Sequence, residues 1–240
     1  MNRNSILRVS GILILCAVTS LAQAPAANSA KGGYFTSAQP LDLLPIVTPP
    51  PPQNSETVKA ELAELHQIEK TRTPAQVAAA QADSNQENMF YLHTVLGDQF
   101  RPENLPLTAA LSDHIHSEEA AASDVLKAYY NRSRPYAFDP TLHSECGTTT
   151  QASYPSGHSI AGYLEAFALA EMVPEKRNEI LARADDFAHN RLVCGVHYPS
   201  DIATGRQVAY ATFGYLMANP KFQSDLAGAR AEVRKLLGLK

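Results

Sequence analysis

The sequence lacks the features that would assign it to several large classes of protein. It has no excess of basic residues, because 20 Lys and Arg stand against 24 Asp and Glu, which argues against a nucleic-acid-binding protein. No repeat period is apparent, and the metal-binding patterns HExxH and CxxC are missing. Beyond the N-terminal region no stretch reaches the length of a membrane span, and strand-like alternation is almost absent. A globular, mainly helical chain is the class that remains.

The N-terminal region has the pattern of an export signal. A basic start with two arginines precedes an apolar run from Val9 to Val18 and small residues around Ala22 and Ala24. This order predicts a secretory signal peptide over residues 1–24, because the run is short for a spanning helix; an uncleaved anchor is the alternative. Cleavage near Ala22 or Ala24 predicts a periplasmic or secreted protein with no stable membrane insertion, and moves the formal net charge from −4 to −6.

Two further regions follow the predicted leader. Residues 25–54 are rich in proline and lack helical periodicity, so we expect an extended arm whose apolar residues pack onto the rest of the protein. Residues 55–240 contain successive runs with helical spacing or capping residues, which predicts a single-domain, all-α helical bundle. The runs are 55–70, 73–84, 86–100, 105–131, 157–173, 175–195, 199–219 and 222–239.

The mature chain would keep two of the three cysteines, Cys146 and Cys194. In an oxidising compartment such a pair suggests a disulfide, which would close a long loop. The alternative is two buried free thiols, since cysteine is a common core residue.

Three basic residues stand near the ends of predicted helices. In "KAYYNRSRP", Lys127 lies late in a long helical run. Arg134 comes after the run and immediately precedes a proline. Arg191 lies near the end of another run, in "HNRLVCG". Cations at a helix C-terminus commonly complement the helix dipole, so the first two residues by themselves indicate only a helix end.

Two histidines lie beside polar partners. In "YPSGH", Ser156 caps a predicted helix, Gly157 lets the backbone approach a ligand, and the amides of the helix start favour an anion next to His158; a helix cap without a ligand is the alternative. In "HYPSD", Asp201 follows His197 at a spacing that lets the carboxylate accept the hydrogen of one ring nitrogen and leaves the other nitrogen its lone pair. A solvated surface pair, or a turn at the intervening proline, is the alternative.

Taken together, these residues are the equipment of phosphoryl transfer. Cations and amides hold a tetrahedral dianion, one histidine attacks in line, and the other protonates the leaving oxygen. The patterns K-x6-RP, PSGH and R-x5-H-x3-D, in this order, resemble the signature of the type 2 phosphatidic acid phosphatase and vanadium haloperoxidase superfamily. Within it the chain is most similar to the bacterial class A non-specific acid phosphatases, which also have a proline-rich segment like residues 41–56.

The resemblance implies a secreted, all-helical phosphoric monoester hydrolase that needs no metal or other cofactor, acts on small phosphorylated substrates and forms a homodimer or larger homo-oligomer. It implies that His197 is the nucleophile that becomes phosphohistidine, that Asp201 orients it and that His158 is the general acid. One departure is Asn190, where the family usually has serine, and it concerns the positioning of the next arginine. The implied phosphate-binding residues are Lys127, Arg134, Ser156, Gly157 and Arg191.

Two other functions would use similar residues. A vanadate-dependent haloperoxidase would hold vanadate in nearly the same cradle, whereas a non-catalytic phosphate-binding protein would have no use for the paired histidine and aspartate. Outside the motifs, Glu118 and Glu119 are candidates for the mouth of the pocket, and His114 and His116 are expected at the surface.

Overall fold

The structure, a computed structural model, describes residues 32–37 and 41–240, so the predicted leader lies outside the described residues. Within this part of the chain all regular elements are helical and no strand occurs, which confirms the all-α prediction. The α-helices are α1 (Glu56–Thr71), α2 (Pro74–Ser84), α3 (His93–Leu96), α4 (Pro106–Tyr130), α5 (Pro135–Phe138), α6 (Gly157–Met172), α7 (Arg177–Val193), α8 (Pro199–Met217) and α9 (Pro220–Leu236). The 3₁₀ turns are η1 (Met89–Leu92), η2 (Pro102–Asn104) and η3 (Pro174–Lys176).

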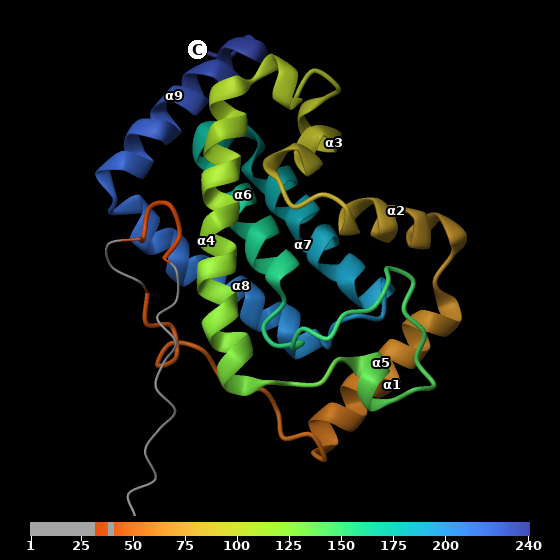
Figure 1. Cartoon of the computed structure of the whole chain (residues 1–240). Coiled ribbons are helices and arrows are strands. Elements are labelled where there is room, and N and C mark those ends of the chain that lie inside the picture. Colours follow the sequence, from red (N-terminus) through yellow and green to blue (C-terminus); the bar gives the residue numbers. More distant parts are fainter. Residues whose placement is uncertain (1–31, 38–40) are drawn as a thin grey trace, which may run out of the picture.

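Helix α6 forms the centre of the bundle, and α4, α7, α8 and α9 pack around it (Figure 1). Nearly all of its side chains are buried, as expected of a helix that is apolar on every face. Its backbone comes close to α7 at Gly162, where a Cβ atom would stand 2.6 Å from the ring of Phe187. Close packing on all sides therefore fixes the position of the α6 N-terminus. No helix among the described residues combines the length and apolar character needed to cross a membrane.

Several helices begin where the capping residues predict, and one predicted helix is shorter than expected. Ser55 caps α1 with its side chain, and Thr73 forms a capping box with Gln76 at the start of α2. The run 86–100 does not form one helix but the turn η1 followed by the single-turn helix α3. That helix ends at Gly97, whose φ of 93° favours glycine and cannot continue the helix.

The described part of the predicted arm, residues 32–37 and 41–54, contains no helix and packs onto the bundle. Glu118 of α4 holds it in place, because its carboxylate accepts hydrogen bonds from the backbone N–H of Phe35 and the hydroxyl of Thr36, both at 2.6 Å. The prediction that Glu118 lies at the pocket mouth is therefore wrong, since this side chain is buried beneath the arm. The arm adds three residues to the main core: Phe35, Leu43 and Val47.

Candidate active site

The three sequence motifs meet at one cavity of about 550 Å³. The C-terminal parts of α4 and α7 and the N-terminus of α6 border it, and loop 146–151 forms a further wall. Two predicted site residues, Ser156 and Asp201, are fully buried and do not line the cavity. The other predicted residues all line it: Lys127, Arg134, Gly157, His158, Arg191 and His197.

A disulfide joins Cys146 to Cys194, which confirms the bonded alternative. It ties loop 146–151 to the residue that follows α7. In the same loop the carbonyl of Gln151 accepts a hydrogen bond from Nε of Arg134 at 3.0 Å. The disulfide and this hydrogen bond together hold one wall of the cavity against the segments that carry its cations.

His197 and Asp201 are brought together by the start of α8. His197 lies two residues before Pro199, where α8 begins, and Asp201 lies in the first turn of the helix. Oδ2 of Asp201 accepts the backbone N–H of Tyr198 at 2.9 Å and Nδ1–H of His197 at 3.2 Å. A capping turn, rather than one face of a continuous helix, therefore forms the predicted pair.

The other ring nitrogen of His197 faces a cation. Nη1 of Arg134 donates to Nε2 at 2.9 Å, and because a guanidinium only donates, Nε2 carries the lone pair and Nδ1 the hydrogen. Burial, reinforced by Arg134 and Arg191, holds the pKa of His197 well below its usual range. His197 is thus a neutral imidazole with one nitrogen tied to Asp201 and a lone pair on the other.

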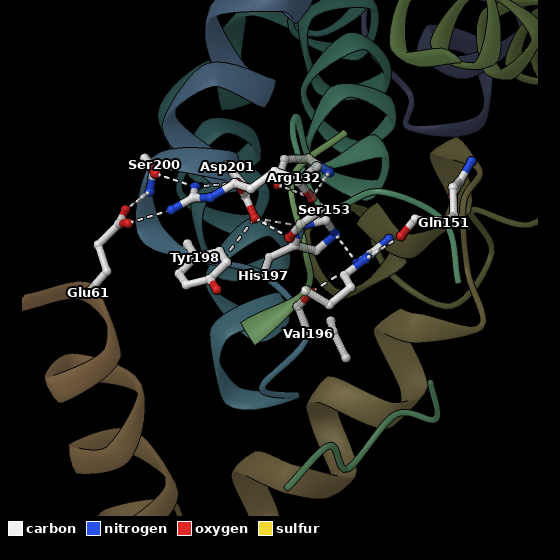
Figure 2. Close-up of polar contacts among 12 residues, drawn as sticks. Glu61, Arg132, Gln151, Ser153, Val196, His197, Tyr198, Ser200 and Asp201 are labelled. Atoms are coloured by element: carbon white, nitrogen blue, oxygen red, sulfur yellow. Dashed lines mark hydrogen bonds and ion pairs between the residues drawn. The ribbon is translucent and has the colours of Figure 1, made fainter. Parts of the chain in front are cut away.

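A buried chain of charged residues supports Asp201 (Figure 2). Nη1 of Arg132 donates to Oδ1 of Asp201 at 2.7 Å, and Nη2 donates to Glu61 of α1 at 2.8 Å. The hydroxyl of Ser153 donates to Oδ2 of Asp201 at 2.5 Å. Burial raises the pKa of Asp201 to about 6, while the charge of Arg132 acts in the opposite direction. Arg132 therefore favours the ionised carboxylate that the hydrogen bond from the histidine requires.

The three cations of the cavity are buried together. Lys127, Arg134 and Arg191 are each less than a tenth exposed. Burial, with a smaller effect of the neighbouring Arg134, lowers the pKa of Arg191 to about 10, and burial also lowers the pKa of Lys127. In the described part of the chain, Nε of Arg191 is buried without a hydrogen-bond partner. A phosphate dianion would complete this arrangement, because it supplies both negative charge and acceptors.

Ser156 and Gly157 form the start of α6. Oγ of Ser156 accepts hydrogen bonds from the backbone N–H of Ser159 at 3.3 Å and from its hydroxyl at 3.0 Å. This geometry makes Ser156 a helix cap and gives no support to a phosphate contact by its hydroxyl. Gly157, the first residue of α6, lines the cavity where the helix presents its N-terminal amides, which is a favourable place for an anion.

His158 has a carboxylate partner that sequence reasoning did not find. Its Nδ1 lies 2.7 Å from Oε1 of Glu87, and its Nε2 lies 3.2 Å from the carbonyl oxygen of Ser84. Both neighbouring atoms are acceptors, so a ring nitrogen of His158 that carries a hydrogen can donate to either of them. The hydrogen bond with His158 in turn lowers the pKa of Glu87.

Asn190, the departure from the expected motif, lies outside the cavity. Its amide donates to Asp83 of α2 at 2.7 Å, and Arg183 donates to the same carboxylate from its two terminal nitrogens, Nη1 and Nη2, at 3.0 and 2.5 Å. Among the hydrogen bonds of the described residues, none joins Asn190 to Arg191. Asn190 therefore connects α7 to α2 and reaches its neighbouring arginine only through the helix.

Sequence reasoning missed four residues of this site and placed a fifth correctly. Glu61 is a charged residue on the apolar face of α1, and this conflict with the helix pattern is the signal that marks it. Arg132 lies inside the first motif, but of the two arginines there the motif assigns a role only to Arg134. Glu87 and Ser153 contact residues far along the chain and carry no local signal. Glu119, in contrast, lines the cavity as predicted.

Comparisons with known proteins agree with these motifs. Residues 107–224 match the PAP2 superfamily. The non-specific acid phosphatase of Salmonella typhimurium strain LT2 is 34% identical over 164 residues, which is 65% of either chain and so just under two thirds of that relative. The non-specific acid phosphatase of Providencia stuartii is 30% identical over 215 residues, 85% of either chain. The chain belongs to the non-specific acid phosphatases of the PAP2 superfamily.

Non-specific acid phosphatases are phosphoric monoester hydrolases, so this membership places the chain among enzymes of that class. The part that matches the superfamily contains all three motifs, from Lys127 to Asp201. Among solved structures, a transmembrane PAP2-type phosphatidylglycerolphosphate phosphatase from Bacillus subtilis aligns with 69% of this chain and 89% of its own. That alignment has 18% identity and a TM-score of 0.49.

Proposed function

We propose that this acid phosphatase is exported by its predicted leader and hydrolyses small phosphate monoesters of broad type through a phosphohistidine at His197, without a metal ion. The observation that carries the proposal is the setting of His197: Nδ1 is tied to Asp201, and Nε2 carries a lone pair beside the buried cations. An anion drawn in by these cations would bring its phosphorus next to that lone pair, which is the condition for in-line attack.

In the first step, Nε2 of His197 attacks phosphorus, and the N–P bond forms while the bond from phosphorus to the leaving oxygen breaks. The three buried cations offset the charge on the equatorial oxygens. His158, which lies beside Glu87, donates a proton to the leaving oxygen, so the alcohol departs neutral. The carboxylate of Asp201 stabilises the positive charge that develops on the ring of His197.

In the second step, water attacks the phosphohistidine. Neutral His158 accepts a proton from the water as its oxygen bonds to phosphorus, the N–P bond breaks, and the electron pair returns to Nε2 of His197. Inorganic phosphate then leaves. Arg134 donates a hydrogen bond to this same lone pair, so we expect a bound phosphate to draw the guanidinium onto its own oxygens and free Nε2.

The proposal needs no metal ion, because protein cations supply the positive charge around the phosphate. Among the described residues, no group of three or more His, Cys, Asp or Glu is arranged to hold a metal ion. Phosphate release measured with and without a chelator tests this part directly. Activity that is lost with the chelator and restored by a divalent metal would contradict it.

The experiment that tests the mechanism is phosphate release from p-nitrophenyl phosphate by the mature protein and by His197→Ala. We expect this substitution to reduce the rate by at least about 10³-fold. His189→Ala removes an exposed histidine of α7 and is the matched control, which should keep the activity of the parent protein. Full activity of His197→Ala would exclude a nucleophilic role for this residue.

A further inference from the structure

The walls of the cavity differ in charge. One face of α4 brings Glu119 and Asp124 to the wall, and Glu87 also lines the cavity beside His158. Loop 146–151, which forms another wall, contains no charged residue. The carboxylates are therefore concentrated in one part of the cavity wall, above a floor of buried cations.

This acidic part is where the leaving group of a substrate would lie. Attack by His197 is in line, so the leaving oxygen points away from His197 and toward the proton donor, His158. Glu87 is the carboxylate partner of His158, and Glu119 lies against Gly157, the residue before His158. A substituent on the leaving group would therefore pass close to both carboxylates.

Of the three carboxylates, Glu119 is the one best placed to act on the leaving group of a substrate. A Cβ atom on Gly157 would stand 2.4 Å from Oε1 of Glu119 and 3.1 Å from Nζ of Lys127, so this carboxylate lies beside both the helix start and a floor cation. Burial raises the pKa of Glu119, although the positive charge of Lys127 acts against this effect. Glu87 is committed to its histidine partner, and Asp124 is exposed, where solvent screens its charge.

We infer that Glu119 is a specificity-determining residue, which makes the site favour phosphate monoesters with a neutral or cationic leaving group over those with a second anionic group. This inference rests on the proposed phosphatase function and deepens it. An ammonium group near Glu119 is attracted, whereas a carboxylate or second phosphate is repelled, and partial burial weakens the screening by solvent. The unpartnered Nε of Arg191 marks a separate place for the transferred phosphate itself. Aminoalkyl phosphates are thus a favoured class, and nucleoside diphosphates and triphosphates a disfavoured one.

The test compares three substrates with two-carbon leaving groups: 2-aminoethyl phosphate, 2-hydroxyethyl phosphate and carboxymethyl phosphate. The quantity measured is kcat/KM for the parent protein and for Glu119→Gln. We expect the ratio of the aminoethyl to the carboxymethyl substrate to fall about tenfold in Glu119→Gln, with the hydroxyethyl substrate changing by an intermediate amount. Because each substrate is compared between proteins, its intrinsic reactivity cancels.

Two further variants make the result decisive. Glu64→Gln removes the same charge from an exposed position on α1 and should leave the ratio unchanged, and Glu119→Asp keeps the charge and should retain the preference even if the glutamine variant folds poorly. An unchanged ratio in Glu119→Gln, an equal change in Glu64→Gln, or loss of the preference in a folded Glu119→Asp would overturn the inference. So would failure of the parent protein to cleave the aminoethyl substrate while it cleaves p-nitrophenyl phosphate. If the parent protein cleaves none of these esters, the proposed function itself fails.

Discussion

The two histidines of the proposed mechanism, His158 and His197, each have a carboxylate partner, but the two pairs are built differently. The side chains of His197 and Asp201 are 2% and 0% exposed, whereas those of His158 and Glu87 are 19% and 36% exposed. Asp201 also accepts hydrogen bonds from Arg132 and other donors, while Glu87 belongs to a short segment between α2 and η1. The comparison indicates a nucleophile held in one geometry and a proton donor that can adjust to leaving groups of different shape.

The largest effect is expected from breaking the buried pair. Asp201→Asn should reduce kcat by about 10³-fold, because an amide can donate to Nδ1 of His197 and so favour the wrong tautomer. Steady-state kinetics with p-nitrophenyl phosphate measure the effect, and Asp186→Asn, an exposed aspartate of α7, is the control. A loss of less than about tenfold in Asp201→Asn would mean that the buried pair does not fix the nucleophile.

The buried chain behind Asp201 should also matter for stability. Glu61→Gln should lower the free energy of unfolding by about 3 kcal/mol, because Arg132 would lose one of its two buried ionic partners. Urea denaturation measures this change. Glu56→Gln, in an exposed ion pair of the same helix, should have a much smaller effect. Equal effects of the two substitutions would contradict a stabilising role for the buried chain.

Glu165 is also a buried carboxyl group, but its hydrogen bond in the described structure comes from a hydroxyl, that of Ser112, at 2.8 Å, whereas Asp201 also accepts from Arg132. Burial raises the pKa of Glu165 well above its ordinary value, so the folded protein keeps a proton that the unfolded chain has lost. Stability should therefore fall as pH rises above the ordinary pKa of a glutamate, by up to about 1.4 kcal/mol per pH unit. Glu165→Gln should remove this contribution, measured by urea denaturation across the pH range. An unchanged slope would contradict a protonated Glu165.

The smallest effect is expected at the less buried pair, His158 and Glu87. Glu87→Gln should reduce kcat about fivefold for an alkyl phosphate and less for p-nitrophenyl phosphate, whose leaving oxygen needs little help from an acid. Glu179→Gln, an exposed glutamate of α7, is the matched control. An equal reduction for both substrates would indicate a purely structural role for Glu87.

Most of the fold could be predicted because its helices carry local signals. Capping residues such as Ser55 and Thr73 mark helix starts, and the uniformly apolar run of α6 marks the centre of the bundle. The run 86–100 was predicted as one helix, and the structure divides it, because apolar residues alone do not distinguish a long helix from short turns that end at Gly97. The path of the arm depends on its contact with Glu118, which no local pattern encodes.

The candidate site could be predicted in part, for a similar reason. The ordered motifs named the side chains that line the cavity, and the structure brings these together. The pairing of His197 with Asp201 was predicted from their spacing, whereas the contacts of Arg132 with Glu61 and of His158 with Glu87 were not, because each joins segments far apart in the sequence. For Ser156 the sequence allowed two roles, a helix cap and a phosphate contact. The hydrogen bond that Ser156 accepts from Ser159 supports the cap.

The central claim is that His197 carries the phosphoryl group during turnover, and one measurement tests it most directly. The mature protein is mixed rapidly with a substrate whose phosphate is radiolabelled and is quenched in alkali, which preserves phosphohistidine, and the labelled peptide is then located by mass spectrometry. We predict a label on His197 in the parent protein and none in His197→Ala. A label on His158, or turnover by the parent protein with no labelled histidine at any time, would contradict this account.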